Sequence, residues 1–105
     1  MSVINSGQIE FWNSEYGLAW ARYADTVDVM FAELSDAVLG ATVTGAGDRV
    51  LDLGCGNGGT ALLAADRVTD IGNVTAIDIS GPMIDRASDR LTEADIVNAI
   101  FILGD

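Results

Sequence analysis

Residues 49–59 read RVLDLGCGNGG, a short apolar strand that runs directly into a glycine-rich turn. A sharp passage from a strand into a helix needs residues without a β-carbon, so that a ligand can approach the backbone and the helix N-terminus. The glycines fit two spacings, because Gly54, Gly56 and Gly58 give G-x-G-x-G while Gly54, Gly56 and Gly59 give G-x-G-x-x-G. The spacing alone therefore leaves two kinds of nucleotide ligand open.

Helices and strands alternate outward from this turn. Apolar positions recur every three or four residues from Trp20 to Val38, which predicts one helix that Asn13 or Ser14 caps and Gly40 ends. The elements expected after it are strand 49–53, helix 60–67, strand 74–79, a helix from 81 that Ser80 caps, and strand 99–103. Apolar strands separated by helices predict an α/β fold with a parallel sheet.

Composition excludes several classes of function. The chain has 105 residues with 16 acids against 5 bases, no histidine, one cysteine and a formal charge of −11. One cysteine without histidine builds neither a zinc site nor an internal disulfide, so we expect no metal, and Ser-His-Asp and Cys-His catalysis are excluded. The charge disfavours nucleic acid and an anionic membrane as partners. The first ten residues do not resemble a signal peptide, so we expect a cytoplasmic protein.

Three acids stand at the carboxyl ends of the three expected strands. Asp52 lies two residues before Gly54, Asp78 ends the second strand, and Asp105 follows the third. Open parallel sheets bind ligands at this edge, where an acid such as Asp78 can accept both hydroxyls of a ribose. A carboxylate at Asp52 would repel a pyrophosphate and attract an ammonium or a sulfonium. The acids therefore favour a cationic nucleoside over a dinucleotide.

These motifs, taken in order, resemble class I S-adenosylmethionine-dependent methyltransferases. The resemblance is carried by VLDLGCGNG at 50–58, VTAIDIS at 74–80 with Met83, and FILGD at 101–105. It implies a Rossmann-like parallel sheet and S-adenosylmethionine as the cofactor. It also implies a role for each matching position: Asp52 near the methionine amino group, Gly54, Cys55, Gly56 and Gly58 lining the cofactor, Asp78 on the ribose hydroxyls, Ile79 and Met83 beside the adenine, and Asp105 on the adenine amine.

The N-terminal stretch is similar to the leading helices of small-molecule methyltransferases of the quinone-biosynthesis type. That similarity implies a helical cap at 1–40 with Trp12, Tyr16 or Trp20 near a small-molecule acceptor, and a cofactor-binding domain at 41–105. The family has a seven-stranded sheet, and this chain stops after about three strands. We therefore expect an incomplete domain, a fragment of a longer methyltransferase, in which the catalytic residues are not identifiable.

Two other functions stay open beside the methyltransferase. An NAD(P)-dependent oxidoreductase fragment is favoured by Gly59 and disfavoured by Asp52. A non-catalytic nucleoside-binding or dimerising module is compatible with the short chain. Because strand 49–53 would lie at an uncovered sheet edge with unpaired backbone groups, we expect a homodimer through that edge.

Overall fold

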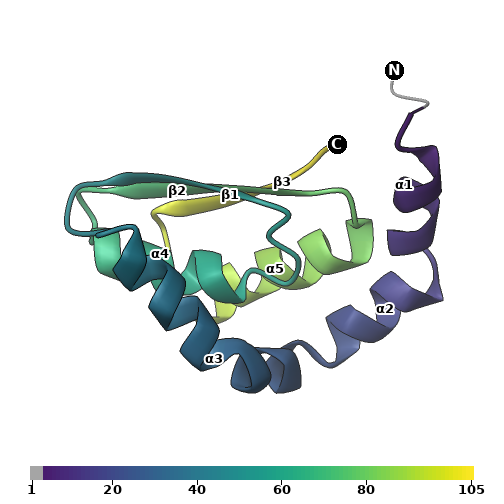
Figure 1. Ribbon diagram of the computed structural model, residues 1–105, viewed down its shortest axis with the longest axis horizontal. Helices are drawn as coiled ribbons and strands as arrows, with labels where there is room; N and C mark the ends of the chain where they lie inside the picture. Colours follow the sequence, from purple (N-terminus) through teal and green to yellow (C-terminus); the bar gives the residue numbers. More distant parts are fainter. Residues whose placement is uncertain (1–3) are drawn as a thin grey trace.

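The computed structural model describes residues 4–105, which form a cap of three helices followed by an alternating β/α unit (Figure 1). The cap contains α1 (Ser6–Trp12), α2 (Glu15–Arg22) and α3 (Ala24–Ala41). The β/α unit contains β1 (Arg49–Leu53), α4 (Gly59–Val68), β2 (Asn73–Asp78), α5 (Gly81–Glu93) and β3 (Ala99–Leu103). The α/β class and the Rossmann-like order of elements predicted from the sequence are confirmed.

The described strands form one parallel sheet in the order β1-β2-β3. One face of this sheet packs against α4 and α5, which lie beneath it in Figure 1. Val74 and Ala76 of the central strand are buried there against Ala61 and Ala64 of α4. Small side chains on the helix let it approach the sheet closely, and this packing fixes the carboxyl ends of the strands beside the helix N-termini.

The opposite face of the sheet is apolar and exposed. Leu51 is 61% exposed, Leu53 70% and Ile100 56%. In Figure 1 the helices drawn lie below the sheet or beyond its right-hand end, so no helix of residues 4–105 covers this face.

The single helix expected between residues 14 and 40 is in fact two. Ser14 caps α2 by accepting from the Tyr16 N–H, as expected, but the helix breaks at Tyr23, whose ψ of 26° leaves the helical range. Gly40 lies inside α3 and does not end it. The break lets the start of the cap bend toward the β2–α5 connection, where the Ser80 hydroxyl donates to the Trp12 carbonyl at 2.6 Å. Apolar periodicity cannot reveal such a break, because it is continuous on both sides of Tyr23.

Within residues 4–105 no helix combines the length and the apolar character that a membrane span requires.

Candidate functional site

The turn after β1 is fixed by the neighbouring strand. The backbone N–H groups of Gly54 and Cys55 both donate to the Ile77 carbonyl, at 2.8 and 3.0 Å. Gly54, Gly56 and Gly58 have φ of +74°, +56° and +86°. Residues with a side chain rarely adopt such positive φ values, so the backbone conformation of the turn requires glycine at these three positions.

Two of these glycines are constrained by different surroundings. A β-carbon at Gly58 would lie 2.5 Å from the Phe101 ring of β3 and 3.3 Å from Ala87 of α5. A β-carbon at Gly56 would meet only the terminal methyl group of the Met83 side chain, at 2.9 Å. Gly58 is therefore needed for packing the turn on the sheet, whereas at Gly56 only the end of the Met83 side chain would have to shift.

Asp78 joins the glycine-rich turn to the next connection of the sheet. One of its carboxylate oxygens accepts from the Gly56 N–H at 2.8 Å, and the other accepts from the Ser80 N–H at 2.9 Å. Each carboxylate oxygen has a further lone pair, so Asp78 keeps capacity to accept hydroxyl donors from a ligand.

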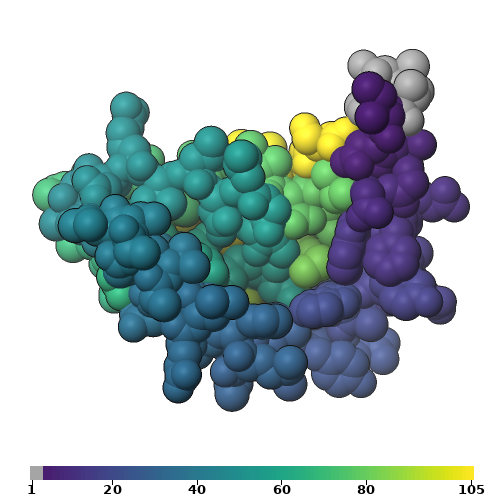
Figure 2. Space-filling model, in the orientation of Figure 1, coloured from purple at the N-terminus to yellow at the C-terminus, as the bar shows by residue number. Residues whose placement is uncertain are grey.

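A cavity of about 660 Å³ opens at this edge of the sheet, a size typical of small-molecule sites. Figure 2 shows the surface hollowed between the cap helices, in purple and blue, and the β/α unit, in teal and green. Trp12 and Trp20 contribute the cap side of the cavity. Six of the residues expected to bind the cofactor line it: Gly54, Gly56, Asp78, Ile79, Met83 and Asp105.

The other three candidate residues lie outside this cavity. Gly58, in the same turn, is buried against Phe101 and Ala87. Cys55 lines a second cavity, toward α3. Asp52 faces the helix side of the sheet and lines a third cavity with Thr60.

Asp52 has an unusual environment for a carboxylate. Its Oδ2 atom is buried and has no hydrogen-bond partner among the described residues. Burial, together with the nearby charge of Asp78, raises the pKa of the Asp52 carboxyl above its ordinary value of 3.8. A buried acceptor without a partner favours the approach of a positively charged donor.

Cys55 does not have the environment of a nucleophile. Burial and the charges of Asp52 and Asp78 raise the pKa of its thiol to about 12, so the thiol stays neutral at physiological pH.

Aromatic residues of the cap differ in their placement. Trp12 and Trp20 lie edge to face, with ring centroids 6.3 Å apart, on the wall of the cavity of about 660 Å³. Tyr16 instead stacks on Phe11 at 4.5 Å and is 52% exposed. Two of the three aromatic residues expected near an acceptor therefore lie at the site.

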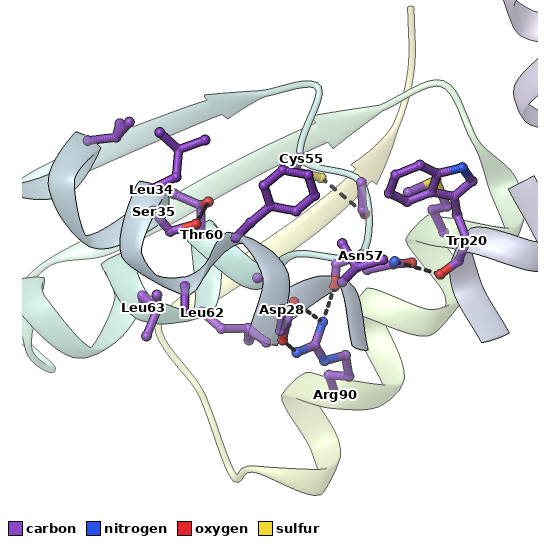
Figure 3. A pocket seen from close by; sticks show the side chains of 17 residues that line it. Trp20, Asp28, Leu34, Ser35, Cys55, Asn57, Thr60, Leu62, Leu63 and Arg90 are labelled. Atoms are coloured by element: carbon purple, nitrogen blue, oxygen red, sulfur yellow. Dashed lines mark hydrogen bonds and ion pairs between the residues drawn. The ribbon is translucent and has the colours of Figure 1, made fainter. Parts of the chain in front are cut away.

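The second cavity, of about 580 Å³, lies between α3 and the glycine-rich turn (Figure 3). Its walls are mainly apolar, and its polar groups are largely paired with one another. The Ser35 and Thr60 hydroxyls hydrogen-bond at 2.8 Å, and Arg90 pairs with Asp28. Trp20, Gly56 and Met83 line both cavities, which therefore share a wall.

Several contacts at the site were not predictable from the sequence pattern. Asn13 donates to the Ile79 carbonyl at 2.8 Å and accepts from the Gly81 N–H at 2.8 Å, which attaches the cap to the β2–α5 connection. Asn57 and Arg90 attach the cap to the glycine-rich turn. Each of these contacts joins residues more than 30 positions apart, so no local spacing in the sequence predicts them.

Comparison with known proteins agrees with this geometry. Residues 50–105 match a family described as the methyltransferase domain. This chain belongs to that family.

A curated relative of this methyltransferase domain is the 27-O-demethylrifamycin SV methyltransferase of Amycolatopsis mediterranei. It is 39% identical over 77 residues, which are 73% of this chain and 28% of that protein. The aklanonic acid methyltransferase of a Streptomyces species is 41% identical over 59 residues, 56% of this chain and 27% of its own length. The chain thus spans little more than a quarter of the length of these relatives.

A crystal structure of coclaurine N-methyltransferase bound to N-methylheliamine and SAH superposes with a TM-score of 0.65 at 26% identity. The match covers 70% of this methyltransferase domain and 22% of that chain. The family and the fold expected from the motifs are confirmed by these comparisons.

Proposed function

We propose that this methyltransferase domain is the cofactor-binding part of an S-adenosylmethionine-dependent enzyme that methylates a small molecule. The observation that carries the proposal is the cavity at the carboxyl edge of the sheet, where Asp78, the glycine-rich turn and Asp105 meet. The relatives named for rifamycin and aklanonic acid methylation, and the SAH in the structure of coclaurine N-methyltransferase, support it.

The residues at the cavity fit this cofactor. Asp78 is proposed to accept the ribose hydroxyls, with Ile79 and Met83 beside the adenine and Asp105 accepting its exocyclic amine. Asp105 accepts one hydrogen bond from Asn5 at 2.7 Å and has a second oxygen for a ligand. Gly54 and Gly56 line the cavity and are proposed to lie beside the cofactor, whereas Cys55 and Gly58 lie outside the cavity and complete the turn that carries them.

Asp52 is proposed to attract the ammonium group of the methionine moiety. The structure places its side chain in the neighbouring cavity with Thr60, so we propose that its negative charge acts on the ammonium across the glycine-rich turn. The same carboxylate disfavours the pyrophosphate of NAD, the ligand of the competing oxidoreductase hypothesis.

S-adenosylmethionine supplies a methyl group on a sulfonium, so the protein mainly has to position the reactants and exclude water. Trp12 and Trp20 stand on the cap side of the cavity, where their rings can shield it from solvent. Residues 1–105 include no histidine or lysine, so within this part of the protein only a carboxylate or a tyrosine could take a proton from the acceptor. We assign no catalytic residue.

We further propose a domain division, a cellular location and an oligomeric state for the chain. We divide it into a cap at 1–40 and a cofactor-binding domain at 41–105. We place it in the cytoplasm, without nucleic acid or membrane as a partner, because its charge of −11 and single cysteine fit that setting. We propose a homodimer through the edge strand β1, supported by the exposure of Leu51 and Leu53.

The proposal predicts that the chain binds S-adenosylhomocysteine and that Asp78→Ala weakens this binding at least about tenfold. Hydrogen bonds to an anion contribute roughly 1.5–3 kcal/mol each, and about 1.4 kcal/mol is one factor of ten in affinity. Calorimetric titration with S-adenosylhomocysteine and with NAD measures both the affinity and the choice of ligand.

The matched control is Asp85→Ala, which removes an exposed acid from α5. It should bind like the wild type. Tight binding of NAD in place of S-adenosylhomocysteine would contradict the proposed function, and unchanged affinity in folded Asp78→Ala would contradict the ribose assignment.

A further inference from the structure

Arg90 joins three separate elements next to the cofactor cavity. It belongs to α5, forms an ion pair with Asp28 of α3, and donates from Nη1 to the Asn57 carbonyl of the glycine-rich turn at 2.9 Å. Figure 3 shows the guanidinium between these two partners. The planar guanidinium presents several N–H donors in fixed directions, so one side chain can hold both acceptors in a defined relation.

The other side of Asn57 is held as well. Its side-chain amide donates to the Trp20 carbonyl of the cap at 2.9 Å, and the residue is only 4% exposed. Asn57 lies directly between Gly56 and Gly58, which both have positive φ. The turn is thus fixed at its middle residue from α5 on one side and from α2 on the other.

Asp28 is packed against the start of α4 in the same cluster. A β-carbon on Gly59 would lie 2.5 Å from a carboxylate oxygen of Asp28. The Arg90 side chain is 11% exposed and that of Asp28 31%. Removing this much water from a charge is costly, and a buried ion pair is often no more stabilising than apolar residues of similar size. Stability alone is therefore a weak explanation for a charged pair at this position.

We infer that Arg90, held by Asp28, is a positioning residue that fixes the glycine-rich turn at Asn57 in the shape that receives the cofactor. The inference rests on the proposed function. A turn made of glycines is intrinsically mobile, so a ligand that needs one shape of it must supply the free energy of ordering unless the protein has already done so. Arg90 orders the turn in advance and links it to the cap.

Arg86 provides a matched control within the same helix. It lies one turn before Arg90 and also pairs with an acid of α3, since its guanidinium is 3.8 Å from Asp25. It forms a second ion pair with Glu93 at 3.0 Å. Asp25 is 87% exposed and Glu93 61% exposed. The Arg86–Asp25 pair therefore also joins α5 to α3, but it has no contact with the glycine-rich turn.

The substitution Arg90→Lys separates the pairing of Arg90 with Asp28 from its contact with the glycine-rich turn. It keeps the positive charge that pairs with Asp28, but a single ammonium cannot reproduce the two directed contacts of the guanidinium. If Arg90 serves only to hold α5 against α3, Arg90→Lys leaves ligand binding unchanged. If it positions the turn, Arg90→Lys weakens binding while the protein stays folded.

The experiment compares the wild type with Arg90→Lys, Arg90→Gln, Asp28→Asn and Arg86→Gln. Calorimetry measures S-adenosylhomocysteine affinity, thermal unfolding measures stability, and hydrogen exchange without ligand follows the amides of residues 54–59. We expect both Arg90 variants to bind about tenfold more weakly, Asp28→Asn less so, and Arg86→Gln within about twofold of the wild type. Without ligand, hydrogen exchange of the amides of residues 54–59 should be faster in both Arg90 variants than in the wild type.

Unchanged affinity and unchanged exchange in folded Arg90→Lys would overturn the inference. A wild-type chain that binds no S-adenosylhomocysteine overturns the proposed function instead. In that case the ligand-free exchange still decides whether Arg90 orders the turn, because it requires no cofactor.

Discussion

At the scale of single residues, the acids of the site differ in how much of their hydrogen-bonding capacity the protein itself uses. Asp78 is engaged by two backbone N–H groups, whereas Asp52 has a buried oxygen without a partner among the described residues. An unpartnered buried carboxylate costs folding free energy, and its charge can still attract a cation in the neighbouring cavity. Asp52 should therefore oppose stability and support binding at the same time.

Asp52→Asn should raise the stability of the fold and weaken the binding of the cofactor. The raised pKa means that the folded state holds the Asp52 proton more tightly than the unfolded state, so this group's contribution to stability falls as pH rises above 3.8. An uncharged asparagine removes that cost. Asp52→Asn should raise Tm at about pH 7, and the gain should vanish at about pH 3, where aspartate is protonated in both states.

The same variant should bind S-adenosylmethionine more weakly, because its amide does not attract an ammonium as a carboxylate does. Thermal unfolding across pH and calorimetry at neutral pH measure the two effects. A loss of stability at neutral pH would mean that Asp52 already has favourable partners in the folded chain.

At the scale of elements, the sequence predicted the strands well and the cap only in part. Strands 49–53 and 99–103 have the expected bounds, and the middle strand is shifted by one residue to Asn73–Asp78. The bounds of the strands are predictable because each strand is a short apolar run that ends near a glycine or an aspartate in the sequence. The break at Tyr23 depends on contacts between the cap and distant loops, such as the hydrogen bond from Ser80 to Trp12, which no periodicity encodes.

The same limit applies to the candidate site. Gly54, Gly56 and Asp78 lie in contiguous motifs and line one cavity, whereas Gly58 of the same spacing lies outside it. Arg90 is an ordinary helical arginine in the sequence, and its importance comes from two partners that lie 62 and 33 positions away. Asp52 was expected to face the ligand crevice, and it lines a neighbouring cavity on the helix side because alternate residues of a strand point to opposite faces.

The glycine-rich turn as an element predicts that its two central glycines respond differently to substitution. At Gly56 a side chain is strained at a φ of +56° and displaces the end of Met83, but it also enters the cofactor cavity, so Gly56→Val should abolish binding of S-adenosylhomocysteine more completely than it lowers Tm. At Gly58 an added methyl meets the Phe101 ring at a φ of +86°, so Gly58→Ala should mainly destabilise the fold. Strain of this kind costs roughly 1–2 kcal/mol before any steric overlap.

Thermal unfolding and calorimetry on the two variants distinguish these effects. Normal binding by Gly56→Val would mean that the turn at Gly56 does not face the ligand. A Gly58→Ala protein as stable as the wild type would show that Phe101 yields easily.

Taken together, residues 4–105 form a sheet that helices cover on one face and that is apolar and exposed on the other. The exposed residues come from the outer strands, including Leu51 on β1 and Ile100 on β3. Among the described residues β1 pairs only with β2, so its other edge offers unpaired backbone groups. An exposed edge next to an apolar face is a surface that further strands of a longer chain or another chain can cover.

The proposed homodimer would cover this surface with a second copy of the chain, against an electrostatic cost. Each copy carries a formal charge of −11, so two copies repel each other at low ionic strength. The Debye length falls from about 30 Å at 0.01 M salt to about 10 Å at 0.1 M. A dimer held by apolar contact should therefore strengthen as salt is added, whereas one held by opposite charges would weaken.

Sedimentation at micromolar concentration should give twice the monomer mass, with the dimer fraction rising with salt. Leu51→Lys places a charge on the apolar face at β1 and should yield a monomer. Val97→Lys, at an 89% exposed apolar residue between α5 and β3, is the matched control and should remain a dimer. A wild-type chain that sediments as a monomer at every salt concentration would show that the exposed face does not pair with itself. An equal loss of dimer in Leu51→Lys and Val97→Lys would show that the contact does not lie at β1.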